Sequence, residues 1–230
     1  MLRSFLAALP AVGLAILAQP AGAFVLDFVA LASGNEHSFL TEDFANIDGS
    51  GIGATVTARD LVDSTPPFDT TGPWGYLDDL FNGDDGGLGV CQTSNCSGDP
   101  DDNIGLNEVA LLEFDTLVEI TSISFSNGLH VDVYNGNVGI NVGASNPTTA
   151  EAFSHIFATA GFAAGGVLDT SLTGSRFSFV ADESFVQGAT GDPSRIYVSA
   201  ITFGVPEPGT ALLLGAGLAG LALLGRRREA

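Results

Sequence analysis

The chain has 230 residues, of which 27 are acidic, seven are arginines and none is lysine, and its formal net charge is −20. A field this negative repels nucleic-acid phosphates and anionic membrane surfaces, so it disfavours both as partners. The many Phe, Val, Ile and Leu side chains in ordered patterns also argue against a disordered chain.

The first 23 residues have the features of a secretory signal peptide, which we expect to form a signal helix. Arg3 precedes an apolar run from Phe5 to Leu17, and Ala21-Gly22-Ala23 provides the small residues of a cleavage site. We expect export through the Sec machinery and removal by signal peptidase after Ala23, which makes Phe24 the mature N-terminus. An uncleaved transmembrane anchor is the alternative, but the run is short and interrupted by proline.

Period-two apolar patterns dominate the region that follows. They predict strands at residues 24–31, 53–58, 108–114, 118–125, 129–134, 138–142, 176–181 and 195–203. Residues 150–160 fit a short helix or a strand equally well. Residues 63–105 are rich in Gly, Pro, Asp and Asn, and a stretch of this length is either functional or locally stapled. Many short strands without intervening helices predict an all-β ectodomain over residues 24–204, an antiparallel β-sandwich or jelly roll.

The C-terminal 26 residues, 205–230, carry a second targeting pattern. Val205-Pro206-Glu207-Pro208 ends the fold, because two prolines cannot continue a sheet ladder. Residues 209–225 are uncharged and just long enough, at about 1.5 Å per residue, to cross a bilayer as a transmembrane helix. The basic tail 226–230 begins with Arg226, Arg227 and Arg228, which hold that end in the cytoplasm and leave the ectodomain outside.

This order of elements resembles the PEP-CTERM sorting signal of bacterial surface proteins. The resemblance rests on the motif at 205–208, the apolar span and the arginine cluster at the extreme C-terminus. It implies that exosortase, a membrane protease-transpeptidase, recognises the motif and cleaves there in a Gram-negative bacterium that makes extracellular polysaccharide. The protein would then be membrane-anchored transiently before it reaches the cell surface or extracellular space. An ordinary C-terminal anchor is the alternative.

The glycines at 215–220 also match the dinucleotide fingerprint G-x-G-x-x-G, but no βαβ unit surrounds them. Small residues in a membrane helix explain them better, because they permit close helix approach. The segment 84–115 is similar to a pattern that recurs in PEP-CTERM ectodomains: a Gly-Gly-Leu-Gly-Val turn, an acidic loop and a strand ending in Phe-Asp. This similarity indicates a family and no particular activity.

Two cysteines, Cys91 and Cys96, are the only ones in the chain. In an exported protein we expect them to form a disulfide that closes a small loop, with free thiols as the alternative. A metal site is disfavoured because no histidine lies nearby. A bridge across four residues would stiffen the local structure more than it stabilises the whole fold.

Clustered carboxylates and amides around residues 99–108 suggest a calcium site, because Ca²⁺ prefers six to eight oxygen ligands. We name Asp101, Asp102 and Glu108 as candidate ligands. The EF-hand template fails, since Ile104 stands where glycine is required and Ala110 where glutamate is required. A solvated acidic loop with local Asx turns is the alternative.

No catalytic constellation is evident in the sequence, so we expect a protein that is not an enzyme. His37, His130 and His155 lie far apart, and no nucleophile elbow occurs. Trp74 and Tyr76 could form a platform for stacking sugars, although packing of loop aromatics explains them as well.

The sequence therefore predicts a non-catalytic surface or matrix protein associated with extracellular polysaccharide and biofilm. A calcium-dependent or aromatic-platform carbohydrate-binding module is the alternative, and a glycan hydrolase is a third.

Overall fold

The computed structural model describes residues 22–60, 73–79, 86–91, 103–105, 108–127, 137–143, 155–158, 166–181, 196–206 and 217. Contacts divide the chain into one compact unit, Gly22–Pro206, and a second formed by Met1–Ala21 and Glu207–Ala230. All the described residues except Gly217 belong to the first unit. Within the described residues no helix is long and apolar enough to cross a membrane. The expected signal helix and transmembrane helix lie outside those residues, apart from Gly22, Ala23 and Gly217.

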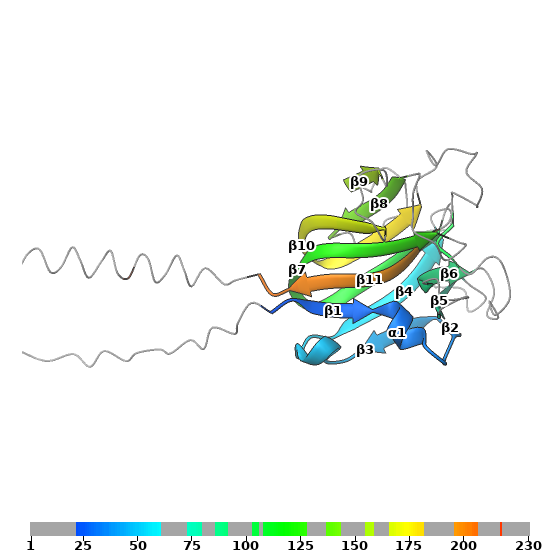
Figure 1. Ribbon diagram of the computed structural model, residues 1–230, viewed down its shortest axis with the longest axis horizontal. Coiled ribbons are helices and arrows are strands. Elements are labelled where there is room, and N and C mark those ends of the chain that lie inside the picture. The colour runs from blue at the N-terminus through cyan, green and yellow to red at the C-terminus, as the bar shows by residue number, and fades with distance from the viewer. Residues whose placement is uncertain are drawn as a thin grey trace, which may run out of the picture. The chain divides into compact units, whose positions relative to one another are not determined.

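The described part of the chain forms an antiparallel sheet of eleven strands, so the all-β expectation is confirmed at this level (Figure 1). The strands are β1 (Phe24–Asp27), β2 (His37–Phe39), β3 (Thr41–Phe44), β4 (Ala54–Asp60), β5 (Trp74–Asp78), β6 (Gly87–Cys91), β7 (Glu108–Asn127), β8 (Asn137–Val142), β9 (His155–Ala158), β10 (Val167–Ala181) and β11 (Ile196–Gly204). Their order is β2-β5-β6-β11-β7-β10-β8-β9, with β1 paired to β11, β4 to β7 and β3 to β4.

The two halves of β7 pair with different neighbours. Its first half, up to Phe114, lies beside β4, whereas its second half, from Glu119, lies beside β11. β10 accompanies both halves, but its register shifts between Gly174 and Arg176. Across that shift β10 advances two residues while its partner on β7 changes from Val118 to Glu113. Extra residues of β7 therefore form a bulge, a feature that bends a strand.

This bend turns β7 back on itself. Phe179 of β10 pairs with Ala110 of β7, yet its ring lies 6.4 Å from the ring of Phe125. A straight strand would separate Ala110 from Phe125 by roughly 50 Å. Phe114 lies beside β4, whereas Phe203 of β11 lies beside the second half of β7. Their ring centroids are nevertheless only 4.8 Å apart. Side chains from both halves consequently meet in one hydrophobic core.

A short polar contact fixes the bend in place. Asp115, at the bulge, accepts a hydrogen bond from the Gly53 amide at 2.9 Å, and its own amide donates to the Gly53 carbonyl at 3.0 Å. A Cβ at Gly53 would stand 3.2 Å from the Asp115 carboxylate and 3.1 Å from the Phe44 carbonyl. Glycine therefore lets the start of β4 approach the corner of β7 closely.

The expectation of a strand over residues 24–31 is wrong in its second half. The chain leaves β1 at Asp27 and forms a short helix, α1 (Phe28–Ala32). The Asp27 side chain accepts a hydrogen bond from the Ala30 amide at 2.9 Å, which is the N-cap interaction that starts a helix. Gly34, with φ of +69°, follows the helix in a left-handed conformation.

Other element boundaries differ from the expectation as well. The two runs at 108–114 and 118–125 belong to one strand, β7. For residues 150–160 both a helix and a strand were open, and residues 155–158 form a strand. The expected loop at 63–105 contains β5 and β6, and β10 begins at Val167, well before the strand expected at 176–181. The expected strand at 129–134 and the turn after it lie outside the described residues.

The glycine-rich turn at the start of β6 is set by close backbone packing. The Gly86 carbonyl accepts hydrogen bonds from the buried hydroxyls of Ser126 and Ser199, at 3.0 and 2.9 Å. Gly87 has φ of +133°, and a Cβ there would stand 2.5 Å from the Val198 carbonyl oxygen. No other residue fits this position, because both the backbone angle and the space require glycine.

We predict that Gly87→Ala lowers the free energy of unfolding by at least about 3 kcal/mol, because strain and a backbone clash add together. Gly34→Ala is the matched control, since its φ is also positive but no atom lies within 4 Å of the place a Cβ would take. The control should cost about 1 kcal/mol. Urea denaturation followed by circular dichroism measures both, and equal losses would contradict the packing argument.

Candidate functional site

The sorting motif begins where the sheet ends. β11 stops at Gly204, and Val205 and Pro206 follow it outside the strand. Val205 is 39% exposed, so the start of the motif is accessible to a partner. Glu207, Pro208, Arg226, Arg227 and Arg228 lie outside the described residues.

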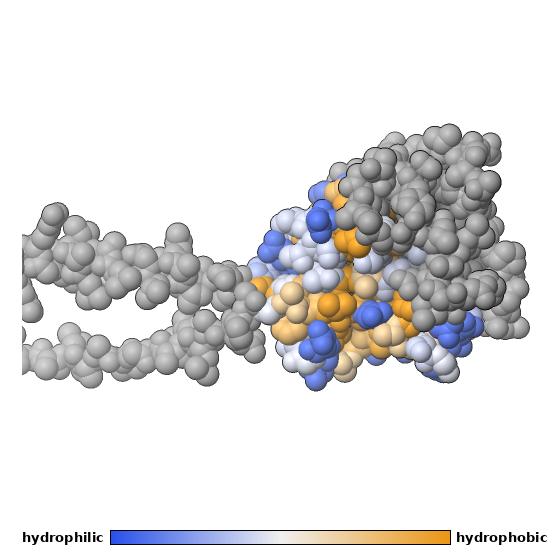
Figure 2. All heavy atoms as spheres, in the orientation of Figure 1, coloured by the Kyte–Doolittle hydropathy of each residue, from blue (hydrophilic) through white to orange (hydrophobic). Residues whose placement is uncertain are grey.

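β1 lies directly beside this C-terminal junction. Phe24 pairs with Phe203 and Asp27 with Ala200, and the Phe24 and Phe203 rings are 5.9 Å apart. Figure 1 shows that β1 begins where β11 ends, at the same end of the two paired strands. In the same orientation, Figure 2 shows hydrophobic and hydrophilic residues intermingled over the described part of this face. The first residue expected after signal cleavage therefore neighbours the last residue before the sorting motif.

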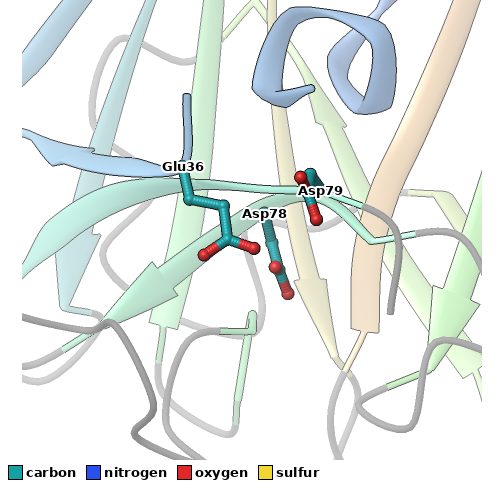
Figure 3. Close-up of side chains that lie close together, drawn as sticks. All are labelled: Glu36, Asp78 and Asp79. Atoms are coloured by element: carbon teal, nitrogen blue, oxygen red, sulfur yellow. The ribbon is translucent and has the colours of Figure 1, made fainter. Parts of the chain in front are cut away.

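Three carboxylates form a second candidate site, at the end of β5 (Figure 3). Glu36, Asp78 and Asp79 each place an oxygen within 4.8 Å of the others. The register explains why they meet: His37 pairs with Leu77, so the next positions along β2 and β5 bring Glu36 opposite Asp78. Asp78 is buried, whereas Glu36 is exposed.

Hydrogen bonds hold two members of this carboxylate trio. The Gly34 amide donates to Asp79 at 3.3 Å, which ties the trio to the turn after α1. The Tyr76 hydroxyl donates to Glu36, also at 3.3 Å. The turn after α1, the start of β2 and the end of β5 thus position the carboxylates together, although these segments are far apart in sequence.

Partial burial raises the pKa of the Glu36 carboxyl. The charge of Asp78, and a hydrogen bond and charge from Asp79, raise this pKa further, while the bond from Tyr76 lowers it. Like-charged carboxylates at this separation can share a proton or bind a hard cation such as Ca²⁺. The arrangement has the chemistry of a cation or proton site, and nothing in it selects one ligand.

Of the three calcium ligands expected from the sequence, only Glu108 is among the described residues. Asp101 and Asp102 are outside the described residues. Glu108 is buried, and its Oε2 accepts a hydrogen bond from the Gly105 amide at 2.7 Å, which closes the turn before β7. The hypothesis of calcium binding by these residues stays a prediction, and isothermal titration with CaCl₂ that gives no heat would contradict it.

Trp74 and Tyr76 project from the same side of β5, as alternate residues of a strand do. Tyr76 is only 2% exposed and packs with Cys91 and Trp74, so its ring presents no free face. Trp74 is partly exposed. A sugar-stacking platform would therefore depend on Trp74, and sugar binding stays a prediction.

Cys91 ends β6 and is buried. Cys96 lies outside the described residues, so the expected disulfide stays a prediction. Among the histidines, His37 in β2 lies 3.7 Å from the Glu42 carboxylate, and His155 in β9 stacks on Phe157. His130 is outside the described residues.

Sequence reasoning missed the carboxylate trio. Glu36 lies in a short polar segment, and Asp78 and Asp79 lie in a stretch expected to be loop. The signal that could have found them is the alternation in Trp74-Gly-Tyr-Leu-Asp78, which predicts a strand ending in two acidic residues. It does not reveal which strand lies beside it.

Comparison with known proteins identifies the C-terminal pattern. Residues 204–228 match the PEP-CTERM protein-sorting motif, so the chain carries this motif at its C-terminus. The match begins at Gly204, the last residue of β11. Neither a search of curated proteins nor a search of solved structures returned a match. The motif implies an exported protein that exosortase sorts to the surface.

We predict that Glu36→Gln stabilises the protein at pH 7 and not at low pH. The pKa of Glu36 is higher in the folded protein than in the unfolded chain, so ionising this carboxyl costs stability. The cost grows as the pH rises toward the folded-state pKa and is complete above it. Below about pH 4 Glu36 is mainly protonated in both states, so the cost disappears. The melting temperature should rise by about 1–2 °C at pH 7, because partial exposure screens the repulsion.

Asp169→Asn is the control for this substitution, because it removes one exposed negative charge from β10 without touching the trio. Melting curves recorded at about pH 3.5 and at pH 7 should show no comparable gain for the control. An equal gain in both variants would mean that the effect comes from net charge, and a gain for Glu36→Gln at the lower pH would contradict the proton linkage.

Proposed function

We propose that this protein is a non-catalytic component of the bacterial cell surface or extracellular matrix, associated with extracellular polysaccharide and biofilm. The observation that carries the proposal is the PEP-CTERM motif at residues 204–228, which begins at the last residue of β11. Sorting at this motif would release the whole of β11 with the ectodomain. The protein would be processed by signal peptidase and exosortase and would be anchored by residues 209–225 between these two steps.

We infer that the ectodomain is a β-sandwich of the jelly-roll kind. Support comes from the bend in β7, because strands that pass through a bulge can leave one layer and enter another. The contact of Phe125 with Phe179 requires side chains from two halves of the sheet to face each other. β1, β11 and the second half of β7 would form one layer, and β4, β8 and the first half of β7 the other.

The acidic character of the domain fits a matrix role. Residues 24–204 contain 25 acidic side chains and three arginines, so the domain repels its own copies and attracts cations. The carboxylate trio adds a local concentration of negative charge. A hydrated, acidic and cation-attracting domain suits a polysaccharide matrix, and the sequence offers no catalytic spacing that would favour an enzyme.

A carbohydrate-binding module is the second candidate. Partly exposed Trp74, at the start of β5, supports it, because an indole face gives sugars a large amphipathic contact. Burial of Tyr76 weakens it, since only one aromatic face is then available. A glycan hydrolase ranks third, since abundant carboxylates single out no catalytic pair.

We predict that the mature protein lacks residues 209–230 when exosortase is present. Intact-mass spectrometry of protein from the cell surface should give a mass that ends near Pro206–Pro208. In a strain without exosortase the same protein should stay in the membrane fraction at its full C-terminal length. Mature surface protein that retains residues 209–230 would show that the segment is a simple anchor.

We predict that deletion of this protein changes flocculation or biofilm mass without abolishing polysaccharide synthesis. Complementation with Trp74→Ala should restore the phenotype fully if the role is structural. Glycan-array binding by the wild-type protein that Trp74→Ala abolishes would instead favour the carbohydrate-binding module. Turnover of a polysaccharide, lost on changing one carboxylate, would favour the hydrolase.

A further inference from the structure

His37 and Glu42 bring two metal-binding side chains together outside the sites described above. His37 lies in β2 and Glu42 in β3, and the Nε2 atom of the ring is 3.7 Å from Oε2 of the carboxylate. The two side chains are 31% and 34% exposed, so a dissolved ion can reach both. An imidazole nitrogen and a carboxylate oxygen are both common ligands of Zn²⁺.

The other ring nitrogen of His37 determines which atom a metal can use. Nδ1 lies 2.7 Å from the Asn35 carbonyl oxygen, closer than the Asn35 side-chain nitrogen at 3.4 Å. A carbonyl oxygen only accepts hydrogen bonds, so Nδ1 carries a hydrogen and donates it. In the neutral ring Nε2 therefore has the lone pair, and this atom lies beside Glu42. A histidine that binds a metal commonly donates its other ring N–H to a backbone carbonyl in this way.

The His37 ring is held in position by its surroundings. The Asn35 amide donates to the Ala32 carbonyl at 2.7 Å, which anchors the segment before β2 to the last residue of α1. The centroid of the His37 ring is also 6.0 Å from that of Phe39, which is buried. The imidazole is thus restrained before an ion arrives, and such preorganisation lowers the entropic cost of binding.

The distance between Nε2 and Oε2 favours a bridging ion over a direct hydrogen bond. An N–H···O bond spans up to about 3.2 Å, so a contact of 3.7 Å is too long for one. Two ligands of a tetrahedral Zn²⁺, each about 2.1 Å from the ion, lie roughly 3.4 Å apart. A small rotation of the partly exposed Glu42 side chain closes the difference.

We propose that His37 Nε2 and Glu42 Oε2 bind one Zn²⁺ ion, whose coordination is completed by water. Within the described strands, β2 pairs with β5 and β3 pairs with β4, and Leu40 alone separates β2 from β3 along the chain. The ion therefore links two consecutive strands that have different neighbours in the sheet. The net charge of −20 raises the concentration of cations around the protein and so favours loading of the site.

The pair differs in chemistry from the carboxylate trio. Glu36, Asp78 and Asp79 offer only oxygen ligands, which suit Ca²⁺, whereas an imidazole ligand suits Zn²⁺ and not Ca²⁺. An excess of CaCl₂ should therefore leave the binding of Zn²⁺ at His37 unchanged. Displacement of Zn²⁺ from His37 by Ca²⁺ would overturn the proposal, because it would show a site built from oxygen ligands alone.

Isothermal titration with ZnCl₂ tests the site in the full-length chain, purified in detergent without a polyhistidine tag. We expect His37→Gln and Glu42→Gln each to weaken the binding of one Zn²⁺ ion per chain by at least about tenfold, since loss of a supporting contact alone commonly costs this much. His155→Gln is the matched control, because β9 and β2 lie at opposite ends of the strand order. It should bind Zn²⁺ like the wild type. Equal affinity of the wild type and His37→Gln would overturn the proposal.

Long-range ¹H–¹⁵N NMR of the histidine rings identifies the atom that binds. Neutral His37 should carry its hydrogen on Nδ1, and Zn²⁺ should shift the Nε2 resonance while the Nδ1 hydrogen remains. An unchanged His37 ring at saturating Zn²⁺, or coordination through Nδ1, would overturn the proposal and leave an ion pair with Glu42. Melting curves without metal check that each variant folds, and where one does not, the spectrum of the wild type decides.

Discussion

The bend of β7 at Asp115 is the constraint on which the rest of the structure depends. Without it, Phe125 and Phe179 would lie at opposite ends of a long ribbon, and the core would have only one apolar face. The bulge carries an energetic cost, because residues around Asp115 and Leu117 leave the ladder and are exposed. The contact between Asp115 and Gly53 offsets part of that cost and ties β4 to the corner.

Two arginines of the sheet, Arg59 in β4 and Arg176 in β10, are both influenced by the negative charge of Glu113. Glu113 pairs with Arg176 across β7 and β10, and the two side chains form a hydrogen-bonded ion pair at 2.7 Å. This bond raises the pKa of Arg176, while burial lowers the pKa of Arg59, which Glu113 partly counters. The charge of Glu113 therefore acts on both arginines, and its exposed ion pair with Arg176 adds only modest stability.

The sequence predicts strands best where burial has a simple pattern. In the second half of β7, buried Val118 and Ile120 alternate with Glu119, and period two is visible. In the first half, consecutive residues from Val109 to Leu112 are buried, because both faces of the strand are covered there. Both runs were recognisable as strands, but nothing local shows that they are one strand with a bend.

Missed elements have equally physical causes. β5 and β6 are rich in glycine because the Phe39 ring lies on Gly75, where a Cβ would clash with it, and because Gly87 packs on β11. A glycine-rich segment predicts a loop from sequence, even where each glycine is required by close packing against a residue that is distant in the sequence. The same limit applies to the carboxylate trio, whose members meet only through the pairing of β2 with β5. The sorting motif could be predicted from the sequence because all its elements lie in one continuous segment and do not depend on the fold.

The pairing of β1 with β11 joins the fold to the targeting signals. The contact spans nearly the whole ectodomain, and such non-local pairing forms late because the intervening chain must first be ordered. Asp48 then occupies the outer edge of β1, which protects a short apolar strand from pairing with another copy. The pairing with β11 therefore fixes one edge of β1, and Asp48 covers part of the other.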